Sequence, residues 1–303
     1  MAKKVPEMLD GKYVVESAAL TRSLYTAVAK LEEKLGIDIP KPYTVRIKSG
    51  TTEIRENAFR GCNDIGTVLI PEGVTEIGLY AFQDCKLLEK VVIPDGVTTI
   101  RERVLKSCSS LTSVIIGKGV TTIGNAAFGA CVSLTSLEIP DNVTLIEEFA
   151  FYSCIGLISI TLPNSITEIK ENTFNGCENL ISVTIPDSVT IIRERAFDSC
   201  GLASITIGNN VTTIENCAFI WCRSLKNVTI SESVTLIGEF AFYACTSLAA
   251  VYCKPTTPPT GSSNMFTGND PDRKIYVPTN SVNAYKREMY WMNYHQYIVG
   301  YDF

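Results

Sequence analysis

The sequence predicts a solenoid of about ten stacked 23-residue coils, with a parallel β-sheet along one face. Cysteines recur along the chain at a nearly constant interval, and an aromatic residue precedes almost every one of them by three positions. Each interval also contains two short alternations of apolar and polar residues, which is the pattern of β-strands. A unit of this size cannot bury its apolar face alone, so successive units must stack.

Composition excludes several classes of function. Hydrophobic residues make up 46% of the 303 residues and charged residues 19%, which excludes a largely disordered chain. The net charge of -5 argues against a nucleic-acid-binding surface. His295 is the only histidine, so multi-histidine metal sites and most histidine-dependent catalysis are excluded. We find no apolar window long enough for a membrane span and no signal-peptide core after Met1.

Residues 1–42 are predicted to be an N-terminal cap or attachment segment. Residues 14–36 show the spacing of an amphipathic helix that ends before Gly36. Its apolar positions are Leu20, Leu24, Val28, Leu31 and Leu35. Such a helix would cover the open end of the first coil. The alternative is a short coiled coil that joins chains into an oligomer.

Residues 43–253 contain the repeat. The cysteines are Cys62, Cys85, Cys108, Cys131, Cys154, Cys177, Cys200, Cys222 and Cys245, all 23 residues apart except for one interval of 22. The residues three positions earlier are Phe59, Phe82, Leu105, Phe128, Phe151, Phe174, Phe197, Phe219 and Phe242. A shortened turn at Gly201 accounts for the interval of 22, and we expect it to leave the stack intact.

Each coil is predicted to contain two strands. The first has two inward aliphatic residues that flank one outward residue, as in Ile160 and Leu162. A turn with Pro or Gly follows in most coils, and then Val-Thr-x-Ile forms the second extended piece, as at 143–146. At about 4.8 Å per strand step, ten coils make a rod roughly 45 to 50 Å long.

The complete unit, Leu-x-x-Leu/Val-x-Ile-Pro-x-x-Val-Thr-x-Ile-x-x-x-Ala-Phe-x-x-Cys, resembles the BspA-type leucine-rich repeat of bacterial surface proteins. The resemblance implies a leucine-rich repeat solenoid and a non-catalytic surface protein that mediates adhesion or protein-protein interaction. Where the general leucine-rich pattern has an Asn or Cys ladder, this chain has Gly73, Gly96, Gly119, Asn142, Ser165, Ser188, Asn210 and Ser233. The BspA-type variant shares that departure.

Residues 254–303 are predicted to form an α+β cap. We expect a loop over 255–270, a strand over 274–277 and a helix over 281–290. Trp291, Tyr294, Tyr297 and Tyr301 would thicken this cap, and His295 would have a structural or surface role. The segment also resembles the C-terminal caps of such proteins in gut Bacteroidetes.

The cysteines in register are expected to be inert, buried thiols. Their side chains would point the same way instead of toward each other, which argues against disulfides, and their spacing does not suit zinc. Cys217 lies outside this row, in a position whose residue varies between coils. We therefore expect Cys217 to be exposed and to be the most reactive thiol.

Carboxylates also recur, and they give the strongest alternative to a binding function. Glu56, Glu102, Glu148, Glu171, Glu194 and Glu239 share one position in six of the nine coils. Pairs of them could hold Ca²⁺ or act in acid–base chemistry. Neighbouring residues such as Arg101, Lys170 and Arg193 favour a solvated, mixed-charge edge instead. With no catalytic motif, we predict a protein that is not an enzyme and has no cofactor or metal.

Two surfaces are candidate binding sites. Leu69, Val92 and Ile115 are outward residues of successive predicted strands, where later strands have mainly hydroxyl residues. Aromatics occupy positions beside the Ala-Phe turn that are polar in other coils: Tyr80, Phe149, Tyr152, Trp221, Phe240 and Tyr243. The alternatives are strand propensity or a covering N-terminal helix for the first set and local packing for the second.

The leading hypothesis is macromolecular recognition at a cell surface. The partner would be a protein or a glycoconjugate on a host or bacterial surface. The second hypothesis is a phage tail or envelope structural component that assembles through residues 1–42.

Overall fold

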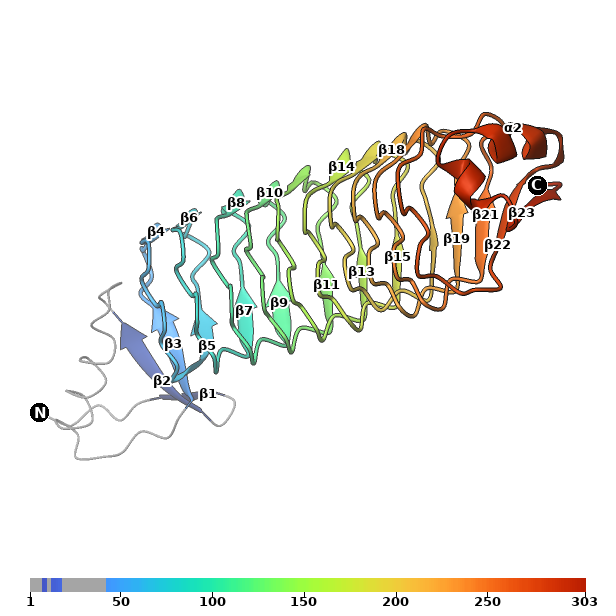
Figure 1. Cartoon of the computed structure of the whole chain (residues 1–303). Helices are drawn as coiled ribbons and strands as arrows, with labels where there is room; N and C mark the ends of the chain where they lie inside the picture. Colours follow the sequence, from blue (N-terminus) through green and yellow to red (C-terminus); the bar gives the residue numbers. More distant parts are fainter. Residues whose placement is uncertain (1–6, 10–11, 18–41) are drawn as a thin grey trace, which may run out of the picture.

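The computed structural model is a straight solenoid whose coils follow one another from the N-terminal to the C-terminal end (Figure 1). It describes residues 7–9, 12–17 and 42–303, with side chains from residue 42 onward. The predicted fold class is therefore confirmed.

One side of the solenoid is a row of parallel strands. They are β3 (Tyr43–Ile47), β5 (Ile65–Leu69), β7 (Lys90–Val92), β9 (Ser113–Ile115), β11 (Ser136–Glu138), β13 (Ser159–Thr161), β15 (Ser182–Thr184), β17 (Ser204–Thr206), β19 (Asn227–Ile230), β21 (Ala250–Cys253), β22 (Lys274–Pro278) and β23 (Ile298–Tyr301). Neighbouring strands pair in register, so Leu137 lies beside Ile160 and Ile160 beside Val183.

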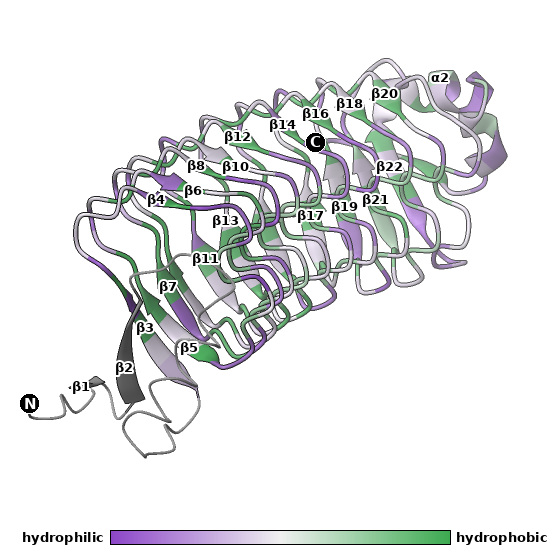
Figure 2. Ribbon diagram, turned by 90° about the vertical axis from the view of Figure 1, so that its left-hand side faces the viewer, coloured by the Kyte–Doolittle hydropathy of each residue, from purple (hydrophilic) through white to green (hydrophobic). Residues whose placement is uncertain are grey.

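Short two-residue strands form a second row. They are β4 (Glu53–Ile54), β6 (Glu76–Ile77), β8 (Thr99–Ile100), β10 (Thr122–Ile123), β12 (Leu145–Ile146), β14 (Glu168–Ile169), β16 (Ile191–Ile192), β18 (Thr213–Ile214) and β20 (Leu236–Ile237). The isoleucine that ends each strand is buried. Figure 2 shows apolar segments recurring from coil to coil along both rows, as the sequence period predicts.

The first row is divided into three hydrogen-bonded sheets. The interruptions lie between β9 and β11 and between β15 and β17. The second interruption directly follows the shortened turn at Gly201. The stack itself continues there, because β16 still pairs with β18 and the rings of Phe197 and Phe219 lie 5.1 Å apart.

A column of stacked phenylalanine rings runs through the core. The buried residues in this column are Phe59, Phe82, Leu105, Phe128, Phe151, Phe174, Phe197, Phe219, Phe242 and Phe266. Successive rings are nearly parallel, with centroids 5.1 to 5.6 Å apart and interplanar angles of 2 to 11°. Leu105 interrupts the column once.

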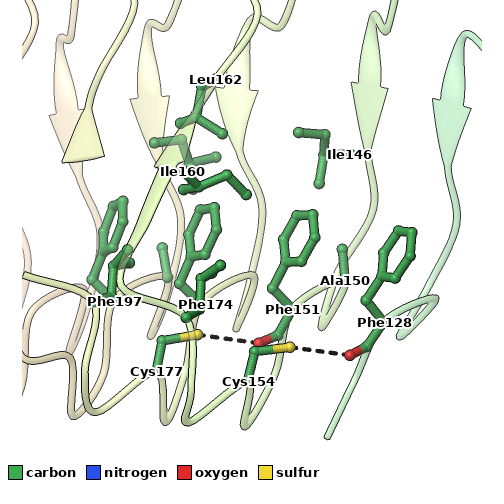
Figure 3. Packing of buried hydrophobic residues seen from close by; sticks show 14 of the residues in the cluster. Phe128, Ile146, Ala150, Phe151, Cys154, Ile160, Leu162, Phe174, Cys177 and Phe197 are labelled. Atoms are coloured by element: carbon green, nitrogen blue, oxygen red, sulfur yellow. Dashed lines mark hydrogen bonds between the residues drawn. The ribbon is translucent and has the colours of Figure 1, made fainter. Parts of the chain in front are cut away.

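The cysteines form a second column beside the rings. The thiol of each cysteine from Cys85 to Cys245 donates to the backbone carbonyl of the Phe-column residue in the preceding coil, at 2.9 to 3.2 Å. Figure 3 shows two such bonds, from Cys154 to Phe128 and from Cys177 to Phe151. All eleven cysteines of the chain are free and buried.

Threonines make a third contact between coils, on the surface. In six coils, the threonine just before the short strand donates its hydroxyl to the carbonyl of the same threonine in the preceding coil, at 3.2 to 3.5 Å. The amide of Asn142 and the hydroxyls of Ser165 and Ser233 make similar bonds to the preceding coil. These residues form part of a polar ladder at the positions where the general leucine-rich pattern has Asn or Cys.

The Ala-Phe turn requires left-handed backbone at two places in each coil. We number positions from the cysteine of the coil, so that Phe59 occupies slot −3. Slots −5 and −1 have positive φ, as at Asn57 (56°) and Gly61 (71°). The N–H groups of slots −5, −3 and −1 then donate to carbonyls of the next coil, as from Asn57 to Leu79. This ladder joins the coils on the side away from the sheet.

The N-terminal prediction is wrong where the structure describes it. Residues 14–17 belong to strand β2 (Lys12–Ser17), not to a helix. β2 pairs in parallel with β3, and β1 (Glu7–Leu9) pairs with β2 in antiparallel fashion. The run Tyr13-Val14-Val15 favours a strand, which outweighed the helical spacing. Leu20, Leu24, Val28, Leu31 and Leu35 lie outside the described residues.

The C-terminal segment contains one more coil than the sequence indicated. Within the predicted loop, Phe266 stacks on Phe242, and Asn269 accepts a hydrogen bond from the backbone N–H of Cys245 at 3.0 Å. The predicted strand is β22, and the helix is shorter than expected, spanning α2 (Val282–Arg287) between the 3-10 turns η1 (Thr279–Ser281) and η2 (Trp291–Tyr294). Trp291 and Tyr294 are buried, whereas His295 is exposed.

The phenylalanine column generates a stability prediction. Phe151→Ala should lower the free energy of unfolding by about 3 to 5 kcal/mol, because the fixed neighbours on both sides cannot close the cavity. Phe151→Leu should cost about 1 to 2 kcal/mol, since Leu105 shows that leucine fits this column. Urea denaturation of both variants checks the order. Equal losses would contradict a ring column that determines core packing.

The thiol column generates a pH prediction. Burial raises the pKa of Cys154 to about 12, so folding favours the neutral thiol. The contribution is complete below the ordinary thiol pKa, about 8.5, and is lost as pH rises from there toward 12. Cys154→Ser should make the decline of unfolding free energy shallower by about 1.4 kcal/mol per pH unit in that window. Denaturation at pH 8, 9 and 10 measures this, and identical slopes would refute it.

Candidate binding surfaces

Cys217 is not the exposed thiol that its variable position predicted. Only 8% of its surface is accessible, and burial raises its pKa. It occupies slot −5, where the in-register neighbours are the longer side chains of Arg195 and Phe240. A small residue between two large ones is covered by them. The expected exposure of Cys217 is therefore wrong, although it is still the most accessible of the eleven cysteines.

The predicted carboxylate row lies beside a network of ion pairs that other carboxylates make. Of the row itself, Glu102 and Glu194 pair with Arg103 and Arg195 at 3.5 and 3.7 Å. Arg193 contacts Glu168 at 2.7 Å and Glu215 at 2.9 Å, and Lys170 contacts Glu147 at 2.9 Å. These carboxylates raise the pKa of both basic groups. A hollow of about 280 Å³ among these side chains also reaches Glu148 and Glu171. Lys170 and Arg193 already partner Glu147, Glu168 and Glu215 there, and the described residues contain no cluster of metal-ligand type.

Tyr80 is held by its own neighbours. The guanidinium carbons of Arg60 and Arg103 lie 5.6 and 5.8 Å from its ring centroid, on adjacent coils. Its hydroxyl donates to Glu102 at 3.3 Å. The structure therefore places Tyr80 in a separate polar cluster near the N-terminal end of the solenoid.

The five other aromatics beside the Ala-Phe turn, which we call the edge aromatics, fall into two groups. Phe149 and Tyr152 make an edge-to-face pair with centroids 6.0 Å apart, and Phe240 and Tyr243 make one at 5.3 Å. Trp221 belongs to the second group, because its backbone N–H donates to the carbonyl of Tyr243. Tyr152 and Trp221 are the most exposed members, at 39% and 41%.

Residues at the positions of these aromatic pairs also interact in coils that have polar residues there. Slots −5 and −2 interact within one coil: Arg60 donates to Asn57, Asn175 to Asn172, and Arg195 to Asp198. The aromatic pairs occupy the same two slots. Slots −5 and −2 can therefore hold either a polar pair or an aromatic pair, and two coils have the aromatic pair.

The sheet-face trio lies on a different surface. Val92 and Ile115 are 43% and 59% exposed, and Leu69 is half-buried. Beside Ile115, where the ladder between β9 and β11 is interrupted, lies a hollow of about 510 Å³ lined also by Val114, Glu138 and Pro140. The nine candidate residues therefore do not form one site.

The structure also reveals an aliphatic patch that sequence reasoning missed. Val132, Ile155, Ile158 and Ile181 are 38 to 54% exposed on the turns that follow three successive cysteines. Ile181 donates its backbone N–H to the carbonyl of Ile158, so these two residues are direct neighbours. Comparison of slots +1 and +4 between coils would have found them, because other coils have mainly polar residues there.

The described coils match the sequence model of a known repeat. The model of the BspA type leucine rich repeat region covers residues 41–157 and 144–270, in six copies. The chain belongs to this BspA-type family. No protein among the curated ones is significantly similar to it.

Solved structures resemble this chain to different degrees, and the first of the following shares its fold. A leucine-rich repeat protein from Bacteroides ovatus is 22% identical over 86% of this chain and 92% of its own, with a TM-score of 0.54. A leucine-rich repeat protein of T. pallidum is 26% identical over 60% of this chain and 77% of its own, with a TM-score of 0.48. A leucine rich cell surface protein from Faecalibacterium prausnitzii is 28% identical over 69% and 78%, with a TM-score of 0.37.

The described part of this BspA-type chain contains no helix with the length and apolar character needed to cross a bilayer.

The aromatic pairs beside the Ala-Phe turn should contribute less to the free energy of unfolding than the buried phenylalanine column does. Phe149→Asn should change the free energy of unfolding by less than about 1 kcal/mol, because relief at the left-handed position offsets the lost ring contact. The same substitution at the buried Phe151 should unfold the protein. Thermal denaturation of both variants is the measurement. A large loss at Phe149 would show that its ring is a structural element.

Proposed function

We propose that this BspA-type protein is a non-catalytic recognition protein of the cell surface, which mediates adhesion or protein-protein interaction through its repeat surface. The single observation that carries the proposal is that exposed or half-exposed aromatic residues occupy left-handed backbone positions. Phe149, Phe240 and Trp221 have φ of 59°, 57° and 59°.

The fold does not need aromatic residues at these positions. Left-handed backbone is unfavourable for bulky residues and is adopted most easily by Gly and Asn. Asn57 and Asn172 fill slot −5 elsewhere, and Gly61 and Gly176 fill slot −1. The aromatic residues therefore cost stability without a structural requirement, and strain of this kind is concentrated at functional sites.

The arrangement suits a protein partner. Trp and Tyr are the residues that most often dominate the binding free energy of protein interfaces. Phe149 and Phe240 occupy the same slot four coils apart, which corresponds to about 19 Å along the axis. Two rigidly spaced groups let a single partner bind at both, which raises its overall affinity. The BspA-type family, whose leucine-rich solenoid is typically non-catalytic, supports the same proposal.

The test is equilibrium binding of fluorescently labelled protein to epithelial cells, extracellular-matrix proteins and bacterial cells in parallel. The edge variant Phe149→Ala/Tyr152→Ala/Phe240→Ala/Tyr243→Ala should weaken saturable binding by at least about tenfold. The matched control Asn57→Ala/Arg60→Ala changes the same two slots in a polar coil and should bind like the wild type.

Two results would contradict the proposal. If the edge variant binds host cells and matrix as tightly as the wild type does, the aromatic edge is not the recognition surface. If the protein binds bacterial cells alone, the envelope or phage component becomes the better account.

A further inference from the structure

An aromatic cluster lies on the outer face of the C-terminal sheet, away from the Ala-Phe edge. Tyr252 on β21 and Tyr276 on β22 stack with centroids 4.9 Å apart and an interplanar angle of 12°. Tyr301 on β23 lies at 68° to the first ring and 66° to the second. Phe303 follows at 5.1 Å from Tyr301. We call these four residues the tyrosine platform.

The platform is accessible from solvent. Tyr301 and Phe303 are 43% and 50% exposed, and Tyr252 and Tyr276 are half-buried, because they cover each other. The rings stand at two orientations, so the cluster offers both ring faces and hydroxyl edges. Aromatic side chains with a polar tip are suited to ligands that are apolar on one side and polar on the other.

A row of hydroxyls leads into the platform. Thr206, Thr229, Tyr252 and Tyr276 lie on adjacent strands and pair in register. With about 4.8 Å between strands, the four hydroxyl-bearing residues extend over about 14 Å in a straight line. Ser204 and Asn227 form a second, parallel row two residues earlier on the same strands.

These hydroxyls differ from the threonines on the other strand row. The hydroxyls of Thr212 and Thr235 each donate to a carbonyl of the preceding coil. Within the described part of the chain, the hydroxyls of Ser204, Thr206 and Thr229 make no hydrogen bond to protein. They are therefore available to a ligand.

Charge on this face is confined to its C-terminal end, where Lys274 on β22 is in register with Ala250 and the ammonium of Lys254 lies 6.0 Å from the ring centroid of Phe303. The outward residues of β17, β19 and β21 are Ser204, Thr206, Asn227, Thr229, Ala250 and Tyr252. A partner that relied on salt bridges would find no counter-charge on these strands. A neutral partner with many hydroxyl groups would find both hydrogen-bond donors and acceptors.

We propose that this face binds a neutral, extended polysaccharide, such as a β-1,4-linked glycan, aligned with the solenoid axis. The apolar faces of its sugar rings would pack on the tyrosine platform, while its hydroxyls would pair with Thr206 and Thr229. An extended glycan repeats its hydroxyl groups along a straight line, as the row does, whereas a helical glycan would curve away from it. Repeated weak contacts then add along the chain.

Isothermal titration calorimetry tests this with cellohexaose, mannohexaose and xylohexaose, and with polygalacturonate as the charged comparison. We expect saturable binding to at least one of the three neutral hexasaccharides and none to polygalacturonate. Tyr252→Ala/Tyr276→Ala should weaken that binding by about tenfold or more. Thr206→Val/Thr229→Val, which keeps the β-branched shape that suits a strand, should also weaken it.

Two controls make the result decisive. Thr212→Val/Thr235→Val removes two hydroxyls that are already bonded within the protein, and it should leave glycan binding unchanged. The edge variant at Phe149, Tyr152, Phe240 and Tyr243 should also bind glycan normally, so failure here is distinguishable from failure of the adhesion proposal. The inference is overturned if no neutral hexasaccharide binds, or if the tyrosine and threonine variants bind as tightly as the wild type.

Discussion

The rest of this solenoid depends on in-register contact between neighbouring coils, in which the column thiols from Cys85 to Cys245 donate to a carbonyl of the preceding coil. This hydrogen bond joins equivalent positions of neighbouring coils, as from Cys154 to Phe128 and from Cys177 to Phe151. Because the carbonyl belongs to the Phe column, the bond fixes the distance between successive rings as well. Burial keeps the thiols neutral, so the donor is retained at ordinary pH. The same carbonyl also accepts the backbone N–H of the cysteine in its own coil, as from Cys131 to Phe128, so the thiol occupies its second acceptor position.

The same constraint separates structural from variable positions. Slots that point into the column are nearly constant, whereas slots −5 and −2 hold an Arg–Asp pair, an Asn pair or two aromatics without altering the coil. The surface is therefore a set of rows whose chemistry changes along the axis while their spacing does not. The Ala-Phe edge and the outer sheet face lie on different sides of each coil, so one chain can present two independent recognition surfaces.

The period made the repeat predictable, and features that depart from the period were the ones missed. Phe266 continues the ring column after an interval of 24 residues, with Asn269 where a cysteine would stand, so no regular spacing announced it. Cys217 is buried by larger neighbours in adjacent coils, a property that its own slot does not encode. The interruptions beside β11 and β17 depend on how strands align in space. The positive φ of Phe149 and Trp221 could not be predicted from the sequence either, because aromatic residues disfavour left-handed backbone.

The central claim is that inward slots build the stack and outward aromatic slots are free for recognition. Saturation mutagenesis with cell-surface display, scored by the amount of folded protein, tests it most directly. We expect the Phe column to tolerate almost no polar substitution and the Cys column none larger than serine, while Phe149, Tyr152, Trp221, Phe240 and Tyr243 tolerate most. Intolerance at the edge aromatics equal to that of Phe151 and Phe174 would contradict it, because those rings would then be part of the fold and not a binding surface.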